Sequence, residues 1–193
     1  MQLPNKFLRD YKRLLRLLNS GAVFCAVDTE TTGLSVTQSR VIELGAVLFD
    51  NTGVLDTFSS LINPCCEIPA EATSVHHITN QMVACAPSAK TVLADFVDFT
   101  KDAILVAHNA QFDLRFINNE LELCGMSALN NKAIDTLALS RWAYPAAEHH
   151  SLQYLAHAMG IDVESAHRAC DDAKVCRHVF LRCLKDTQAV QKI

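Results

Sequence analysis

The sequence predicts an α/β fold, a mixed sheet of about five strands flanked by helices. Two wholly apolar runs, 23–27 and 103–107, indicate strands buried on both faces of a sheet. The stretches 40–49 and 54–62 are joined by Asp-Asn-Thr-Gly, a typical turn sequence, so the first three strands form an antiparallel meander. Beyond residue 88, short strands alternate with helical patterns, an order that favours parallel strands.

Local signals define the elements of the N-terminal half. Apolar residues recur at helical spacing over 6–18, and Asn19-Ser20-Gly21 is a typical helix end. Pro64 breaks the strand pattern before it, which predicts a loop as far as Pro69. The expected order is a helix over 6–18, a strand from 23 to Thr32-Gly33, strands over 40–49 and 54–62, a loop over 64–69, and helices over 79–85 and 88–100.

The C-terminal half repeats a strand-then-helix pattern. Asp135 and Ser151 each stand where a helix-capping side chain is expected, and Gly125 marks a helix end. The expected order is a strand over 103–107, a helix over 111–124, a short strand over 133–134, a helix carrying Leu137 and Leu139, and helices over 151–159 and 170–184. Because no repeat or linker interrupts this order, the whole chain, 1–193, is predicted to be one domain with a core over 22–185.

Composition indicates a globular, intracellular protein. Half of the 193 residues are hydrophobic and 20% are charged, which is enough apolar material for a full core. No apolar segment approaches the roughly 20 residues that span a bilayer, and no signal peptide is apparent, so we expect a cytoplasmic protein without membrane contact. The eight cysteines include no C-x-x-C motif and are better interpreted as reduced, mostly buried thiols than as a disulfide frame or zinc site.

Charge is divided unequally along the chain. The net charge is −4, but residues 1–20 hold five basic side chains against one acidic, a balance of +4. The remaining residues therefore carry −8. An acidic body preceded by a basic amphipathic helix is predicted.

The first buried strand ends in two carboxylates, Asp28 and Glu30, separated by one residue. Side chains alternate along an extended chain, so the two carboxylates point to the same side with Cβ atoms about 7 Å apart. Neighbouring anions raise each other's pKa unless cations lie between them, so the pair indicates a divalent metal site. The alternative is that Asp28 caps the following segment and Glu30 is merely solvated.

Two further stretches place acids where strands end and helices begin, the usual location of ligands in α/β sheets. Asp113 lies in the first turn of the helix after the second buried strand. His167 precedes Asp172 by five residues, at the start of the last helix. Each acid alone is equally an ordinary N-terminal helix acid. Only the complete set predicts a shared site.

Three motifs in this sequence resemble those of the DEDDh branch of the DnaQ-like 3′–5′ exonucleases, which includes the proofreading subunit of DNA polymerase III, ribonuclease T and oligoribonuclease. The motifs are Val27-Asp-Thr-Glu-Thr-Thr-Gly-Leu34, Val106-Ala-His-Asn-Ala-Gln-Phe-Asp113 and His167-Arg-Ala-Cys-Asp-Asp172. The resemblance implies a ribonuclease H-like fold and two Mg²⁺ or Mn²⁺ ions. It also implies metal binding by Asp28, Glu30, Asp113 and Asp172, with His167 as general base. Less specific agreement extends to Val75-His-His-Ile-Thr79, Ala86-Pro87, Asp135-Thr136 and His150-Ser-Leu152.

The resemblance also suggests substrate contacts and contains two departures. Residues expected to contact substrate are Thr31, Gly33, Leu34, His76, His108, Asn109 and Phe112. His77 stands where the family commonly has glycine, and Asp171 stands where an apolar residue usually precedes the last acid. Asp172 is the expected ligand because its five-residue offset from His167 is the family's. Aromatic side chains that could stack on bases are Phe112, Phe116, Trp142 and Tyr144.

The resemblance predicts an enzyme that hydrolyses phosphodiester bonds at the 3′ ends of single-stranded DNA or RNA and releases nucleoside 5′-monophosphates. A polymerase or another protein is a possible partner. Two alternatives are a catalytically silent module that binds nucleic acid or protein, and a phosphatase acting on small phosphate esters. The basic helix either packs on the body with an ordinary solvated face, binds substrate phosphates beyond the terminal nucleotide, or docks another protein.

Overall fold

The computed structural model describes residues 6–163 and 166–190, and its centre is a five-stranded mixed sheet in the order β3-β2-β1-β4-β5. Strand β1 pairs antiparallel with β2 and parallel with β4, and β4 pairs parallel with β5. The strands are β1 (Phe24–Thr31), β2 (Val41–Phe49), β3 (Val54–Leu61), β4 (Ile104–Ala107) and β5 (Ala133–Asp135). The predicted α/β class, with an antiparallel meander followed by parallel strands, is confirmed.

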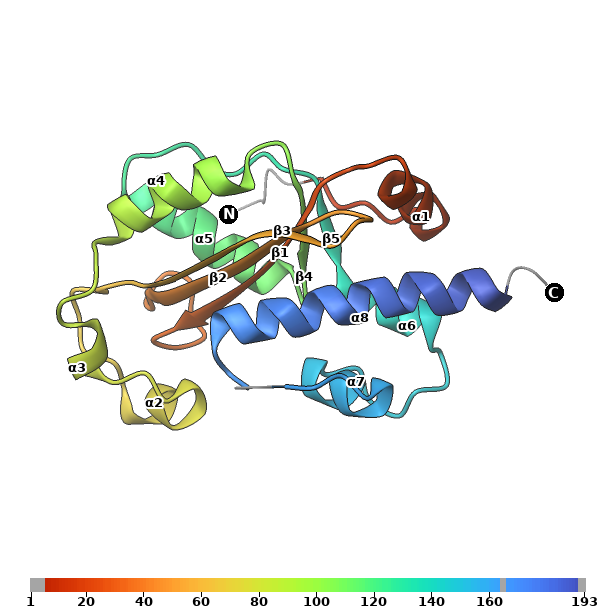
Figure 1. Ribbon diagram of the computed structural model, residues 1–193. Helices are drawn as coiled ribbons and strands as arrows, with labels where there is room; N and C mark the ends of the chain where they lie inside the picture. The colour runs from red at the N-terminus through yellow and green to blue at the C-terminus, as the bar shows by residue number, and fades with distance from the viewer. Residues whose placement is uncertain (1–5, 164–165, 191–193) are drawn as a thin grey trace.

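Helices cover both faces of this sheet (Figure 1). One face carries α4 (Ala89–Thr100) and α5 (Gln111–Leu123). The other carries α1 (Tyr11–Asn19), α6 (Thr136–Ala143), α7 (Leu152–Met159) and the long α8 (Ala169–Val190). Two short helices, α2 (Ala70–His76) and α3 (Asn80–Val83), follow β3. In the described part of the chain, no helix is long and apolar enough to cross a membrane.

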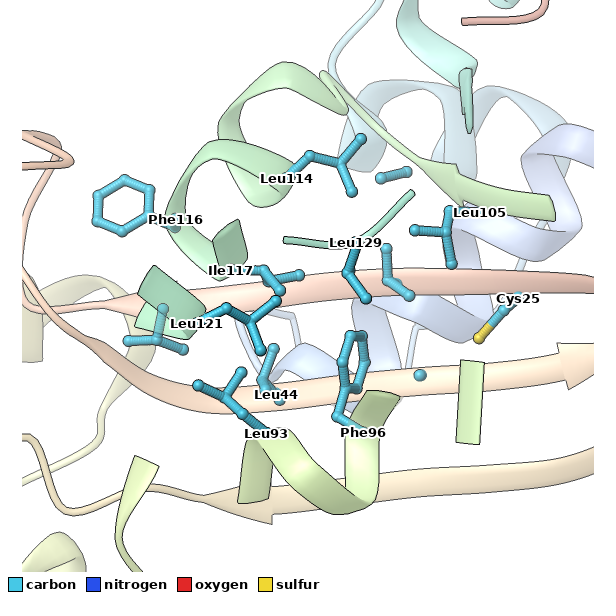
Figure 2. Packing of buried hydrophobic residues seen from close by; sticks show 14 of the residues in the cluster. Cys25, Leu44, Leu93, Phe96, Leu105, Leu114, Phe116, Ile117, Leu121 and Leu129 are labelled. Carbon is cyan, nitrogen blue, oxygen red and sulfur yellow. The ribbon is translucent and has the colours of Figure 1, made fainter. Parts of the chain in front are cut away.

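Alternation along β1 divides the apolar core between the two faces. Cys25 belongs to the apolar cluster that also contains Leu93 and Phe96 of α4 and residues of α5 (Figure 2). Phe24 instead packs against Phe180 of α8, with ring centroids 5.3 Å apart. The strand is therefore buried on both faces, as its unbroken apolar sequence predicts. Extending the alternation places the even-numbered acids at its end on the α8 face.

The N-terminal helix begins later than its apolar spacing predicts. Helix α1 starts at Tyr11, where the Asp10 carboxylate accepts a hydrogen bond from the Arg13 amide at 3.1 Å and so caps the helix. The preceding residues bind the open edge of β5. The Leu8 amide donates to the Ala133 carbonyl, and the Ala133 amide donates to the Lys6 carbonyl. Unpaired backbone groups on that edge favour extended chain over another helical turn.

The segment after β3 contains one element that the sequence reading does not predict. Helix α2 follows Pro69, and Glu71 stands in its first turn, a start signal too short to give helical periodicity. Helix α3 spans only Asn80–Val83, rather than 79–85, and Thr79 caps it by accepting from the Met82 amide. The predicted caps Asp135 and Ser151 are both present in α6 and α7.

The cysteines are free thiols, as predicted, but fewer are buried than expected. Cys25, Cys176 and Cys183 lie in the core. Three others are exposed because they lie in the irregular connections that precede α2 and α4 rather than in helices or strands: Cys65, Cys66 and Cys85.

Candidate active site

Three elements bring the predicted acids to the carboxyl end of the central strand. Asp28 and Glu30 lie near the end of β1, Asp113 lies in the first turn of α5, and Asp172 lies in the first turn of α8. Among the described residues, candidate ligand atoms of Glu30, Asp172 and His167 all lie within 4.8 Å of one another, and Asp28 and Asp113 are outside this group. Figure 1 shows the beginning of α8 beside this end of the sheet.

Gly45 of β2 allows α8 to come this close. It pairs with Asp28 in the strand register. A Cβ atom added to it would lie 2.1 Å from the carbonyl carbon of Ala169 and 2.2 Å from the amide nitrogen of Cys170. Only a residue without a side chain leaves room for the backbone of α8's first turn. This contact sets the depth at which Asp172 enters the site.

A hydrogen bond fixes Asp113 from the other face of the sheet. The Thr29 hydroxyl, between the two acids of β1, donates to Asp113 Oδ1 at 2.9 Å. Burial raises the pKa of Asp113 to about 7, and the hydrogen bond from Thr29 opposes this rise. Asp113 is thus oriented by β1 itself.

The four carboxyl groups share an environment that disfavours their negative charge. Burial, with Asp113, Asp172 and Glu30 adding repulsion, raises the pKa of Asp28 well above its usual range. Burial, then Asp172, raises the pKa of Glu30 to about 8. Burial also raises the pKa of Asp172, against a hydrogen bond from Gln153 Nε2 at 2.9 Å. Clustered oxygen donors short of positive charge fit a hard divalent cation such as Mg²⁺ or Mn²⁺.

The loop before α8 presents His167 to solvent beside these acids. Its backbone is left-handed, with φ 61°, and its amide donates to Asp172 Oδ2 at 3.1 Å. Asp172 is only 6% exposed, whereas Asp171 makes an ion pair with Lys174 at 2.7 Å. The geometry therefore favours Asp172 over Asp171 as the acid of the site.

The segment after β1 places one apolar side chain in solvent. Leu34 is 85% exposed. The Thr31 hydroxyl donates to the Gly33 carbonyl at 2.7 Å, and a Cβ on Gly33 would lie 2.8 Å from Ser39 Oγ. The fold thus uses Thr31 and Gly33 to shape this turn and leaves the Leu34 side chain exposed.

The two histidines predicted to contact substrate, His76 and His108, are held by the protein. His76 is 2% exposed, and its Nδ1 accepts from the Ile78 amide at 3.0 Å. Its Nε2 has no hydrogen-bond partner among the described residues. His108 Nε2 donates to the His150 carbonyl at 2.8 Å, while its Nδ1 lies 3.0 Å from the Thr136 hydroxyl. Both ring nitrogens of His108 are therefore engaged within the fold.

The remaining predicted contacts differ in exposure. Asn109 is exposed and left-handed, with φ 64°, and its amide donates to Asp135. Phe112 is half-buried and packs on Phe116 with centroids 4.8 Å apart. Phe116 is fully buried, so the expectation that it stacks on bases is wrong, because it faces the core. Tyr144 donates from its hydroxyl to Asp186 at 2.9 Å.

The family departure at His77 has a structural explanation. His77 is the C-cap of α2 and adopts φ 60°, in the left-handed region where glycine carries no Cβ penalty. Histidine is among the residues that tolerate this region best after glycine.

The structure adds residues that motif reasoning does not identify. The buried Glu43 forms an ion pair with the partly exposed Arg168 next to the acids, Thr29 orients Asp113, and Gln153 binds Asp172. Glu43 carries a detectable signal, a single carboxylate within an otherwise apolar strand sequence. Its partner lies 125 residues away, so the pairing itself has no local signal.

Fold and site together define a class of protein. A mixed five-stranded sheet with carboxylates gathered at the end of its central strand is the architecture of ribonuclease H-like nucleases.

Comparison with known proteins identifies the family within that class. A family profile described as Exonuclease matches residues 25–180. The chain is 45% identical over 159 residues to DNA polymerase III subunit epsilon of Treponema pallidum, covering 81% of this chain and 74% of that protein. The chain therefore belongs to the exonuclease family, among the DnaQ-like exonucleases, and is a hydrolytic nuclease.

Other relatives are longer or share mainly the fold. DNA polymerase III PolC-type of Caldanaerobacter subterraneus is 38% identical over 167 residues, which cover 86% of this chain but 12% of that protein. Exonuclease X in complex with 5′ overhanging duplex DNA gives a TM-score of 0.67 at 26% identity, covering 86% of this chain and 93% of that one. E. coli exonuclease I with a dT13 oligonucleotide gives 0.76 at 18% identity, over 88% and 42% of the two chains, and shows the fold alone.

Proposed function

We propose that this chain is a metal-dependent 3′–5′ exonuclease that hydrolyses the terminal phosphodiester bond of single-stranded DNA or RNA and releases nucleoside 5′-monophosphates. The observation that carries the proposal is that Glu30, Asp172 and the exposed His167 lie together, while Asp28 interacts electrostatically with Asp113, Asp172 and Glu30. Residues 1–193 act as a single domain in this proposal, although 1–5, 164–165 and 191–193 lie outside the described residues.

Four carboxylates would hold the metal ions: Asp28, Glu30, Asp113 and Asp172. Two divalent ions, once bound, supply the positive charge that activates water and stabilises the leaving oxygen in phosphodiester hydrolysis. The fit rests on the donor set: burial and mutual repulsion raise the pKa values of these oxygen ligands, and bound divalent cations would offset that repulsion.

His167 is the proposed general base. Its exposed imidazole can take the proton of the attacking water, and only the neutral ring can do so. The hydrogen bond from its amide to Asp172 ties the position of the base to that of a metal-binding acid. The same loop therefore places both groups relative to the scissile bond.

The proposed substrate is a nucleic-acid end that enters past Leu34, Asn109 and Phe112, which have exposed or half-buried side chains around the acids. The solved structure of exonuclease X is a complex with 5′ overhanging duplex DNA, which supports a nucleic-acid substrate here. The names of the epsilon and PolC relatives support a polymerase as a partner.

Substitution of each acid tests the mechanism. Asp28→Ala, Glu30→Ala, Asp113→Ala and Asp172→Ala should abolish release of mononucleotides from a labelled oligonucleotide in Mg²⁺ while the far-ultraviolet spectrum is unchanged. Asp171→Ala is the matched control and should stay active, because its side chain pairs with Lys174. An active Asp172→Ala variant with an inactive Asp171→Ala variant would overturn the choice of acid.

His167→Ala should lower kcat about 10²–10⁴-fold with little change in KM, since a general base acts in the transition state. Assays with DNA, RNA and two-to-five-nucleotide oligomers would define the substrate. Hydrolysis of a mononucleotide ester but not of an oligonucleotide would favour the phosphatase alternative. Binding without any turnover would favour the silent module.

A further inference from the structure

We propose that Glu43 is a positioning residue for His167, because it fixes the loop that carries the histidine through Arg168 and Ala169. The inference rests on the proposed function in taking His167 as the general base. Glu43 belongs to β2, and neither the metal-binding motifs nor the predicted substrate contacts include it.

Both carboxylate oxygens of Glu43 are used by the start of α8. Arg168 Nη2 donates to Oε1 at 2.7 Å, and Arg168 Nε lies 3.2 Å from each oxygen. The Ala169 amide donates to Oε2 at 3.0 Å. Glu43 is 2% exposed, so the accepting carboxylate is shielded from water, whereas the Arg168 side chain is 39% exposed. The carboxylate therefore grips the two residues that directly follow His167.

His167 needs such support. Its left-handed backbone, φ 61°, is unfavourable for a residue with a Cβ and persists only where neighbouring contacts enforce it. Its own side chain is exposed, and the hydrogen bond from its amide to Asp172 is its one described polar tie. The hydrogen bonds of Glu43 with Arg168 and Ala169 connect this loop to the sheet and so restrict the backbone of His167.

The charge of Glu43 explains why its partner at position 168 is an arginine. Glu43 faces Glu30 across the β1–β2 register, so an unpaired Glu43 would add a fifth carboxylate to the acid cluster. Arg168 neutralises it with a bidentate contact that a lysine cannot reproduce. Because both oxygens are occupied, Glu43 is not available as a metal ligand. Its charge also adds repulsion that raises the pKa values of Asp28 and Glu30, so an effect through the loop must be separated from an effect on metal binding and on overall stability.

The chain contains a matched control for stability. Glu120 of α5 is 1% exposed and binds Arg40 in the same way, with Nε at 2.7 Å and Nη2 at 2.8 Å. It also accepts from a strand amide, that of Val41, at 3.1 Å. This second clamp makes no described contact with the loop of His167. Loss of either glutamate should destabilise the fold similarly, but only one should affect the base.

The experiment measures kcat, KM and Mg²⁺ binding for Glu43→Gln, His167→Ala and the double variant. We expect Glu43→Gln to lower kcat about 100-fold, the typical effect of a 1 Å misplacement, with the dissociation constant for Mg²⁺ and KM unchanged within about twofold. In the His167→Ala background, Glu43→Gln should cause no further loss, because its effect passes through the histidine. Glu120→Gln should reduce the free energy of unfolding while kcat stays at the wild-type value.

Several outcomes would overturn the inference. An unchanged kcat in Glu43→Gln, a full additional loss in the His167→Ala background, or weakened Mg²⁺ binding would each show that Glu43 does not act through His167. If Glu43→Gln fails to fold, the paired change Glu43→Gln with Arg168→Gln removes the unbalanced charge and takes the same tests. An active His167→Ala variant would refute the proposed base itself, and this result is distinguishable from an intact base with an irrelevant Glu43.

Discussion

Gly45→Ala is the substitution with the most direct geometric consequence. The added Cβ would lie 2.1 Å from the Ala169 carbonyl carbon and 2.4 Å from its oxygen, whereas ordinary contact begins at 3.4 Å. The first turn of α8 must therefore retreat by about 1.3 Å. Overpacking of this kind typically costs about 1–3 kcal/mol, which is less than the roughly 5–15 kcal/mol of a typical domain, so the variant should remain folded.

Turnover should fall much more than stability. The retreating turn carries Asp172 and is adjacent to His167, and a displacement of about 1 Å commonly costs about 100-fold in rate. Urea unfolding and release of mononucleotides in Mg²⁺ measure the two effects separately. Gly125→Ala is the control, because Gly125 has φ +70° and no atom within 4 Å of its added Cβ. It should lose about 1 kcal/mol from backbone strain yet keep its turnover.

The reasoning would be refuted by a Gly45→Ala variant that keeps wild-type turnover and stability. Such a result would mean that α8 can move away from β2 without loss of stability, and that its distance from β2 does not determine the geometry of the site. If Gly45→Ala lost no more turnover than Gly125→Ala, the reasoning would also be contradicted, because lower stability alone would then account for the change.

Three further predictions concern pH, a strained residue and the basic helix. Without metal, the free energy of unfolding should fall as pH rises from about 4 to about 8, and Mg²⁺ should reverse the fall. Urea titration in EDTA at both pH values measures this, and equal stability at the two values would contradict the prediction. The sign follows because raised pKa values, about 8 for Glu30 and about 7 for Asp113, mean that the folded state holds protons more tightly. His77→Gly should raise the free energy of unfolding by about 0.5–1 kcal/mol, because the relief of a left-handed φ of 60° exceeds the cost of the extra freedom that glycine gives the unfolded chain. His77→Ala should give no such gain, because alanine keeps the Cβ. Gln substitution of the basic residues near the N-terminus should weaken the binding of long strands, measured by fluorescence anisotropy, and leave dinucleotide cleavage unchanged. The slope of log affinity against log salt should flatten by about 0.7 per lost phosphate contact. An unchanged slope would indicate that the helix is a scaffold or a protein-docking surface. The residues are Lys6, Arg9, Lys12, Arg13 and Arg16.

The apolar stripe of α1 already has a structural role. Leu14 and Leu18 are buried in the core on the α8 face, as the packing interpretation of this helix predicts. The five basic residues of 6–16 are exposed, and no ion pair involves them among the residues described. The salt-dependence experiment tests whether these basic residues bind substrate phosphates.

The sequence by itself determined the features that depend on local pattern. The buried run before Asp28 and Glu30 identifies a central strand, and period-two alternation then directs both acids to one face. The positions of Asp113 and Asp172 in first turns follow from the apolar runs and helix starts around them. These signals lie within a few residues of the element they predict.

Only the tertiary structure decided which distant groups meet. Glu43 and Arg168 are 125 residues apart, and each alone resembles an ordinary charged side chain. The need for glycine at position 45 appears only when α8 is laid against β2. Likewise, the start of α1 at Tyr11 depends on the open edge of β5, which captures residues 6–8. Contacts of this kind are chosen by the packing of the whole chain, because backbone and charge must be satisfied wherever the elements come together.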